Sequence, residues 1–184
     1  MIRWRDRRSR RVLVLGGARS GKSLLAETML HQEKGVRYVA CGPVPDSTDP
    51  EWSARVEQHR LRRPSHWITL ETCDLVPVLR TTGGATLIDC LSTWLAAVMD
   101  DCRVWDGVPG ADVILDKRVD QLVQAWAGAA HRVVAVSNEV GSGIVPATSS
   151  GRRFRDELGT VNARLAAASD AVWLVTAGIP QRMR

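Results

Sequence analysis

Residues 11–23 read RVLVLGGARSGKS, and this stretch decides the fold. RVLVL is apolar after Arg11 and β-branched at alternate positions, which predicts a short buried strand over Arg11–Leu15. The following residues, 16–23, match the pattern G-x-x-x-x-G-K-[ST]. SLLAETMLHQ then has helical composition, and Gly35 can end that helix. A strand, a glycine-rich loop and a helix in this order form the context that the motif requires.

The loop itself predicts a cradle for nucleotide phosphates. Its glycines let backbone N–H groups face one centre, and the positive end of the next helix favours an anion there. Lys22 would reach the β- and γ-phosphates, and the Ser23 hydroxyl would bind Mg²⁺. Arg19 could contact phosphate or form a structural salt bridge. The alternative is a glycine-rich turn without a ligand. The candidate nucleotide-binding residues here are Gly16, Gly17, Ala18, Arg19, Ser20, Gly21, Lys22 and Ser23.

The rest of the chain alternates short apolar strands with longer helices. Strands are predicted over 36–40, 66–71, 85–89, 132–137 and 171–176, and helices over 53–62, 74–80, 90–99, 112–131 and 152–168. This alternation is typical of βαβ units around a parallel sheet with helices on both faces. We therefore expect one α/β domain over residues 11–184, a P-loop NTPase fold with a RecA-like, mostly parallel sheet flanked by helices.

The net charge of +5 is concentrated in residues 1–10, MIRWRDRRSR, which hold five Arg and one Asp. The remaining residues are close to neutral, which argues against a nucleic-acid-binding domain. We expect residues 1–10 to form a solvated, disordered arm. An arm that tethers RNA or a membrane surface is the alternative.

The sequence also predicts where the protein resides. No apolar run reaches the roughly eighteen residues of a membrane span, and the N-terminus has no apolar stretch typical of a signal peptide. The cysteines form no C-x-x-C pair and have no His at zinc-site spacing; they are Cys41, Cys73, Cys90 and Cys102. We expect buried free thiols in a reducing cytoplasm.

Asp89 ends the apolar strand 85–89 and is the candidate carboxylate for holding Mg²⁺ together with Ser23. Its hydrogen bond would run to Ser23 or to a metal-bound water. The alternative is an aspartate that only caps the next helix. The residues thus predict a Mg²⁺-dependent nucleotide binder without specifying which bond is broken.

Five segments resemble one family, the bifunctional adenosylcobinamide kinase/adenosylcobinamide-phosphate guanylyltransferases of cobalamin biosynthesis. The segments are VLVLGGARSGKSLLAE (12–27), DPEWSARVEQHRLRRPSHWITLE (49–71), LIDCLSTWL (87–95), VVAVSNEVGSGIVP (133–146) and GRRFRDELGTVNARLAAASDAVWLVTAGIP (151–180). They occur in the family's order, and the second and fourth are the most specific. The basic arm lies outside the resemblance, and residues 97–111 match it least.

The resemblance implies two transfers. A nucleoside triphosphate, ATP or GTP, phosphorylates adenosylcobinamide, and GMP from GTP is then moved onto that phosphate through a guanylylated histidine. The family histidine falls at His59, whose neutral imidazole can act as a nucleophile. The resemblance also implies GTP, ATP and Mg²⁺ as cofactors, a corrinoid substrate, no nucleic-acid partner and a cytoplasmic homotrimer.

His59 lies in the segment QHRLRRP. Its cationic neighbours would lower its pKa and keep it neutral, and an arginine could clamp triphosphate oxygens. Its spacing alone favours a surface histidine on an arginine-rich helix, and only the resemblance to the family favours a catalytic histidine. Glu71 resembles a nucleotide-contacting glutamate that could accept two hydrogen bonds from guanine, or it is a surface charge at a strand end. The candidate nucleotide-binding residues outside the phosphate loop are Arg60, Leu61, Arg62, Arg63, Glu71 and Asp89.

Other readings stay open. The chain could be another P-loop small-molecule kinase in which His59 is inert, or a non-enzymatic nucleotide-gated binding protein. The segment NEVGSGIVP, residues 138–146, either lies near the active site or is a structural loop.

Overall fold

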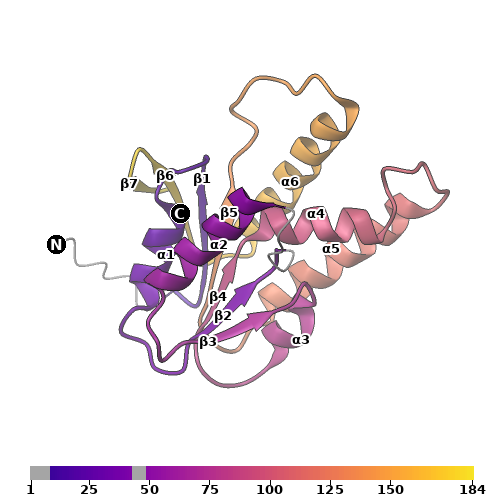
Figure 1. Ribbon diagram of the computed structural model, residues 1–184. Helices are drawn as coiled ribbons and strands as arrows, with labels where there is room; N and C mark the ends of the chain where they lie inside the picture. Colours follow the sequence, from indigo (N-terminus) through magenta and orange to yellow (C-terminus); the bar gives the residue numbers. More distant parts are fainter. Residues whose placement is uncertain (1–8, 43–48) are drawn as a thin grey trace.

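The computed structural model describes residues 9–42 and 49–184, and Figure 1 shows helices packed around a central sheet. The elements follow the predicted alternation. In chain order they are β1 (Arg11–Gly16), α1 (Lys22–Leu30), β2 (Arg37–Ala40), α2 (Pro50–Arg62), β3 (Ile68–Glu71), α3 (Leu75–Arg80), β4 (Thr86–Asp89), α4 (Leu91–Asp101), α5 (Ala111–Ala127), β5 (Val133–Asn138), α6 (Ser149–Ala167), β6 (Ala171–Thr176) and β7 (Ile179–Arg182).

The strands form one sheet in the order β3-β2-β4-β5-β1-β6-β7. All neighbouring pairs are parallel except β6 and β7. The register pairs Asp89 with Val136 on β5, and Asn138, two residues further along β5, with Gly16 on β1. The carboxyl ends of β4, β5 and β1 therefore meet at one edge of the sheet, where open α/β sheets bind ligands. This confirms the expected mostly parallel α/β fold.

Both faces of the sheet are covered, because successive side chains of a strand point to opposite sides. In β1, Leu13 packs into the core cluster under α3, α4, α5 and α6, whereas Val12 and Val14 pack into the cluster under α1. α2 lies beside α1 on this second face (Figure 1). Among the described residues, no helix has both the length and the apolar character needed to cross a membrane.

Several element boundaries differ from the prediction by one to three residues; for example, α2 begins at Pro50 rather than at 53, and α6 begins at Ser149 rather than at 152. The sheet was predicted to end at 176, but β7 returns antiparallel to β6 through a two-residue turn. Ala177 and Gly178 both have positive φ, 51° and 79°, which is the backbone of the tight hairpin turn. Ala-Gly lacks the usual Asn-Gly signal, and Pro180 reads as a strand breaker that only an edge strand accepts. Helix α5 also ends at Ala127, before Gly128, rather than at 131.

The folded part of the chain begins before Arg11. Ser9 is buried, and the Arg10 carbonyl accepts a hydrogen bond of 2.7 Å from the Val133 amide. The amides of Arg10 and Arg11 donate to Asp170 Oδ2 over 3.0 and 2.9 Å. Residues 9 and 10, which were expected to belong to the arm, are therefore part of the fold; the rest of the expected arm, residues 1–8, lies outside the described part of the chain.

Candidate functional site

The phosphate loop connects the end of β1 to the first turn of α1. Gly16 has no room for a side chain, since a Cβ there would lie 2.7 Å from the Val175 carbonyl oxygen. Arg19 and Gly21 have φ values of 56° and 95°, so the loop turns through left-handed backbone at both. The Gly178 amide donates to the Ser20 carbonyl over 2.9 Å, and the β6–β7 turn thus supports the loop. This geometry fits the predicted cradle.

Lys22, the first residue of α1, extends its side chain back over the phosphate loop. Its Nζ donates a hydrogen bond of 3.0 Å to the Gly17 carbonyl. Gly17, Ala18 and Arg19 are exposed, so this part of the loop is open to an incoming ligand.

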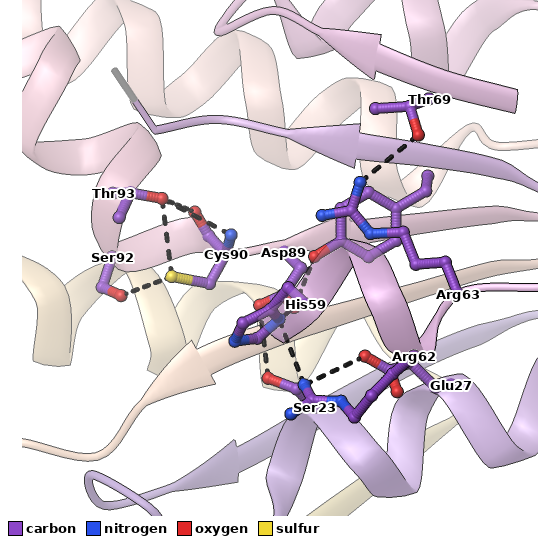
Figure 2. Close-up of polar contacts among 11 residues, drawn as sticks. Ser23, Glu27, His59, Arg62, Arg63, Thr69, Asp89, Cys90, Ser92 and Thr93 are labelled. Atoms are coloured by element: carbon purple, nitrogen blue, oxygen red, sulfur yellow. Dashed lines mark hydrogen bonds and ion pairs between the residues drawn. The ribbon is translucent and has the colours of Figure 1, made fainter. Parts of the chain in front are cut away.

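Asp89, at the end of β4, is the centre of the site (Figure 2). Its Oδ1 accepts a hydrogen bond of 3.4 Å from Ser23 Oγ on α1. Its Oδ2 accepts one of 2.8 Å from the Tyr38 hydroxyl on β2 and lies 3.3 Å from Nδ1 of His59 on α2. The expected bond from Ser23 is therefore present. Cys90, and not Asp89, occupies the N-cap position of α4.

The electrostatics of Asp89 follow from these partners. Burial alone would raise the pKa of this carboxyl, but hydrogen bonds and charge from His59, with hydrogen bonds from Tyr38 and Ser23, outweigh burial and lower it. Asp89 is thus held as a carboxylate next to the phosphate loop.

His59 has two carboxylates near it as well as arginine. Arg62 Nη2 lies 3.3 Å from His59 Nδ1 and 3.4 Å from Glu27 Oε1 (Figure 2). Glu27, His59 and Asp89 each place one ligand atom within 4.8 Å of the others. The sequence pointed only to arginines around His59, and the structure adds the carboxylates of Glu27 and Asp89.

Glu27 and Tyr38 are site residues that sequence reasoning missed, and Glu27 had a signal in the sequence. Glu27 is a buried carboxylate on α1, one turn after Ser23. That i, i+4 spacing places the two side chains on one face of the helix. The spacing was visible in the sequence, but on its own it does not distinguish a site residue from a surface charge.

The three arginines after His59 have different environments. Arg62 joins the cluster, as described above. The Arg63 guanidinium stacks 3.4 Å from the centre of the Tyr38 ring, and its Nη1 donates to Thr69 over 3.3 Å. Arg60 is exposed, and Leu61 is 77% exposed. Within the predicted segment, His59 contacts Asp89, Arg62 contacts His59 and Glu27, and Arg63 stacks on Tyr38.

Glu71 and the 138–146 loop lie at the same edge of the sheet. Glu71, exposed at the end of β3, is in register with Ala40 of β2, which is in register with Asp89. The Glu139 amide donates to the Gly16 carbonyl over 3.0 Å, so this loop starts beside the phosphate loop.

The other histidines lie outside this cluster. His31 is the exposed C-cap of α1 and His66 is exposed. His131, the last residue of the helix predicted over 112–131, is buried outside any helix, and its Nε2 lies 2.9 Å from Thr86 Oγ1. It is buried because α5 ends early and leaves the residue at the entrance to β5.

Comparison with known proteins agrees with this geometry. The bifunctional adenosylcobalamin biosynthesis protein CobU of Salmonella typhimurium is 37% identical over 94% of this chain and 99% of its own length. CobP of Pseudomonas aeruginosa, with the same description, is 37% identical over 95% and 97%. A solved ATPase from a bacterial type III secretion system is 14% identical with a TM-score of 0.56, covering 91% of this chain and 52% of that one; it shows the fold alone.

A family model described as cobinamide kinase / cobinamide phosphate guanyltransferase matches residues 12–183. The match spans the phosphate loop, α2 with His59, the Asp89 strand end and the last helix and strand. The chain therefore belongs to the cobinamide kinase / cobinamide phosphate guanyltransferase family, an enzyme family of the transferase class.

Proposed function

We propose that this chain phosphorylates adenosylcobinamide with a nucleoside triphosphate and then transfers GMP from GTP to the product through a guanylylated His59. The observation that carries the proposal is the contact of His59 Nδ1 with Asp89 at 3.3 Å, since the same carboxylate accepts a hydrogen bond from Ser23 of the phosphate loop. A histidine on the solvent-facing side of α2 would not contact a buried carboxylate that is hydrogen-bonded to this loop.

In the first transfer, the loop amides and Lys22 stabilise the negative charge on the phosphoryl oxygens. The acceptor hydroxyl forms a bond to the γ-phosphorus, and the nucleoside diphosphate leaves. Ser23 and Asp89 offer a hydroxyl and a carboxylate oxygen 3.4 Å apart, the hard donors that Mg²⁺ prefers. A Mg²⁺ ion bound there would neutralise negative charge on the phosphates.

In the second transfer, a ring nitrogen of His59 forms a bond to the α-phosphorus of GTP, and pyrophosphate leaves. An oxygen of the corrinoid phosphate then forms its own bond to that phosphorus, and the nitrogen–phosphorus bond breaks. Arg62 adds a cation beside the nucleophile, where it can pair with phosphate oxygens. Glu71 is proposed to accept hydrogen bonds from N1–H and the amino group of guanine, which adenine does not offer.

The corrinoid is larger than a pocket that one small domain encloses, so we place its site between subunits of a homotrimer. Ile144, which is 96% exposed, and its exposed neighbour Val145 supply apolar surface for such an interface in the segment between β5 and α6. The cysteines of the described residues are all free thiols, in keeping with the reducing cytoplasm as its location. We propose no nucleic-acid partner.

Label transfer from GTP tests the proposal. After incubation with GTP labelled at the α-phosphate, wild-type protein should carry acid-labile, alkali-stable label. His59→Ala should carry none. His66→Ala is the matched control, because His66 is exposed and outside the Asp89 cluster, and it should label like wild type.

The same experiment separates the other candidate functions. Unlabelled wild type that still phosphorylates adenosylcobinamide would identify a kinase with an inert His59. Tight nucleotide binding without turnover of adenosylcobinamide would identify a non-enzymatic binding protein.

A further inference from the structure

We propose that Asp89 holds a proton on Nδ1 of His59, that Tyr38 fixes the Asp89 carboxylate for this task, and that GMP is therefore carried on Nε2 of His59. This inference rests on the proposed guanylylation of His59 and adds the atom that reacts and a residue that positions it.

The two oxygens of Asp89 face different partners. Oδ1 accepts from Ser23 at 3.4 Å and so faces the phosphate loop. Oδ2 lies 2.8 Å from the Tyr38 hydroxyl and 3.3 Å from His59 Nδ1. One oxygen of the carboxylate is therefore directed toward the triphosphate site, and the other can accept a hydrogen bond from His59.

The position of the His59 proton follows from burial. Nδ1 lies 3.3 Å from both Asp89 Oδ2, an acceptor, and Arg62 Nη2, a donor, and cannot satisfy both. The Asp89 side chain is 8% exposed, whereas that of Arg62 is 41% exposed and also reaches Glu27. An unprotonated Nδ1 would place a lone pair against the lone pairs of a buried carboxylate, which is unfavourable where burial weakens solvation. Arg62 can turn to solvent, so the proton lies between Nδ1 and Asp89.

This tautomer leaves the reactive lone pair on Nε2. Attack forms an Nε2–phosphorus bond and expels pyrophosphate, and the ring, which keeps its Nδ1 proton, becomes cationic. Asp89 stabilises that cation, as a carboxylate does behind a catalytic imidazole. When the corrinoid phosphate attacks, the electron pair of the Nε2–phosphorus bond returns to Nε2. No proton has to leave Nδ1 in either step.

Tyr38 is a positioning residue because it acts through Asp89. Its ring is buried on β2, beneath the Arg63 guanidinium at 3.4 Å, and this packing fixes the direction of its hydroxyl. Without the hydroxyl, Oδ2 would lose its shorter hydrogen bond and the carboxylate would be free to rotate away from His59.

The attachment site of GMP is the first test. Protein containing ¹⁵N-histidine is guanylylated with GTP, and phosphorus–nitrogen coupling in the NMR spectrum identifies the bonded nitrogen. We expect Nε2. An adduct on Nδ1 would overturn this inference and leave the proposed function standing. Absence of any adduct on wild type would overturn the proposed function, and this inference with it.

Tyr38→Phe is the second test. We expect the guanylylation rate to fall about 10- to 100-fold, as for loss of an orienting partner, with little change in KM for GTP. The ¹⁵N signals of His59, assigned by their loss in His59→Ala, should shift from one tautomer toward a mixture. An unchanged rate together with an unchanged tautomer would overturn the role of Tyr38.

Thr86→Val is the matched control for this variant. It removes one buried contact, that of Thr86 Oγ1 with His131 Nε2 at 2.9 Å, from the far end of the same strand as Asp89. We expect it to lower stability without changing the guanylylation rate or the His59 tautomer. A loss of rate equal to that of Tyr38→Phe would show a general structural effect and overturn the positioning role.

Discussion

Asp89 accepts hydrogen bonds from β2 and α1 and contacts α2. The free energy of unfolding therefore depends on whether this carboxyl group is ionised. Its pKa in the folded chain is lowered from the ordinary value of 3.8 by His59, Tyr38 and Ser23 against the opposing effect of burial. The unfolded chain therefore binds a proton at Asp89 at a higher pH than the folded chain does. The resulting stabilisation is present above pH 3.8 and is lost as pH falls through the lower folded value.

Asp89→Asn removes this pH-dependent contribution. We expect the difference in free energy of unfolding between wild type and Asp89→Asn to shrink as the pH is lowered below 3.8. Urea denaturation at a series of pH values measures it. Asp116→Asn, at an exposed carboxylate on α5, should keep the wild-type profile. A constant difference across the acid range would contradict the lowered pKa.

For single residues, the sequence predicted the chemical role of a side chain better than it predicted which residues that side chain contacts. Asp89 was predicted because it ends an apolar strand in a chain that also has a phosphate loop. The structure explains why this worked, since parallel strands bring their carboxyl ends to one edge of the sheet. Glu27 and Tyr38 were missed because their roles arise from contacts with β4 and α2, which are distant in sequence. No local pattern marks a buried carboxylate or phenol as a partner of a residue on another element.

Among the elements, α2 is the one that delivers the nucleophile, and its contacts decide where His59 sits. Arg62 links it to Glu27 of α1 over 3.4 Å, whereas Arg60, two residues earlier, is exposed. The sequence QHRLRRP does not show which of these arginines faces α1. Their positions around the helix axis decide it.

Arg62→Ala should therefore loosen α2. We expect faster amide hydrogen exchange over the described helix Pro50–Arg62 and weaker label transfer from GTP, because the ion pair that joins α2 to α1 is lost. Arg60→Ala is the matched control and should exchange like wild type. Equal exchange in the two variants would show that Arg62 does not hold the helix in place.

Element types were predicted more accurately than element ends. Short, mostly apolar runs identified β1, β4 and β6 because both faces of these strands are buried. β7 was missed because its burial is slight and its sequence, IPQR, has no apolar period. Its formation depends on backbone pairing with β6 across the Ala177–Gly178 turn, which is a tertiary property.

For the whole molecule, the alternation of strands and helices was enough to predict a parallel α/β sheet, but not where the folded chain begins. The sequence boundary was placed by charge, at residue 10. The structure places it by hydrogen bonding: Asp170, just before β6, accepts from the amides of Arg10 and Arg11 and from the Arg11 guanidinium at 2.6 Å. Charge density alone cannot report such a contact, because its partner lies at the other end of the chain.

Deletion of residues 2–8 tests this boundary together with the role of the basic arm. We expect the deletion to leave the free energy of unfolding and label transfer from GTP unchanged, since it keeps Ser9, Arg10 and Arg11, whose burial and hydrogen bonds hold the start of β1. Asp170→Ala is the contrasting variant and should cost about 1–3 kcal/mol, because it leaves backbone amides of the first strand without their acceptor. Urea denaturation measures both. If the arm instead binds RNA, the full chain will show an RNA affinity that falls steeply with salt, and the deletion will abolish it. That result would contradict the proposal that the protein has no nucleic-acid partner.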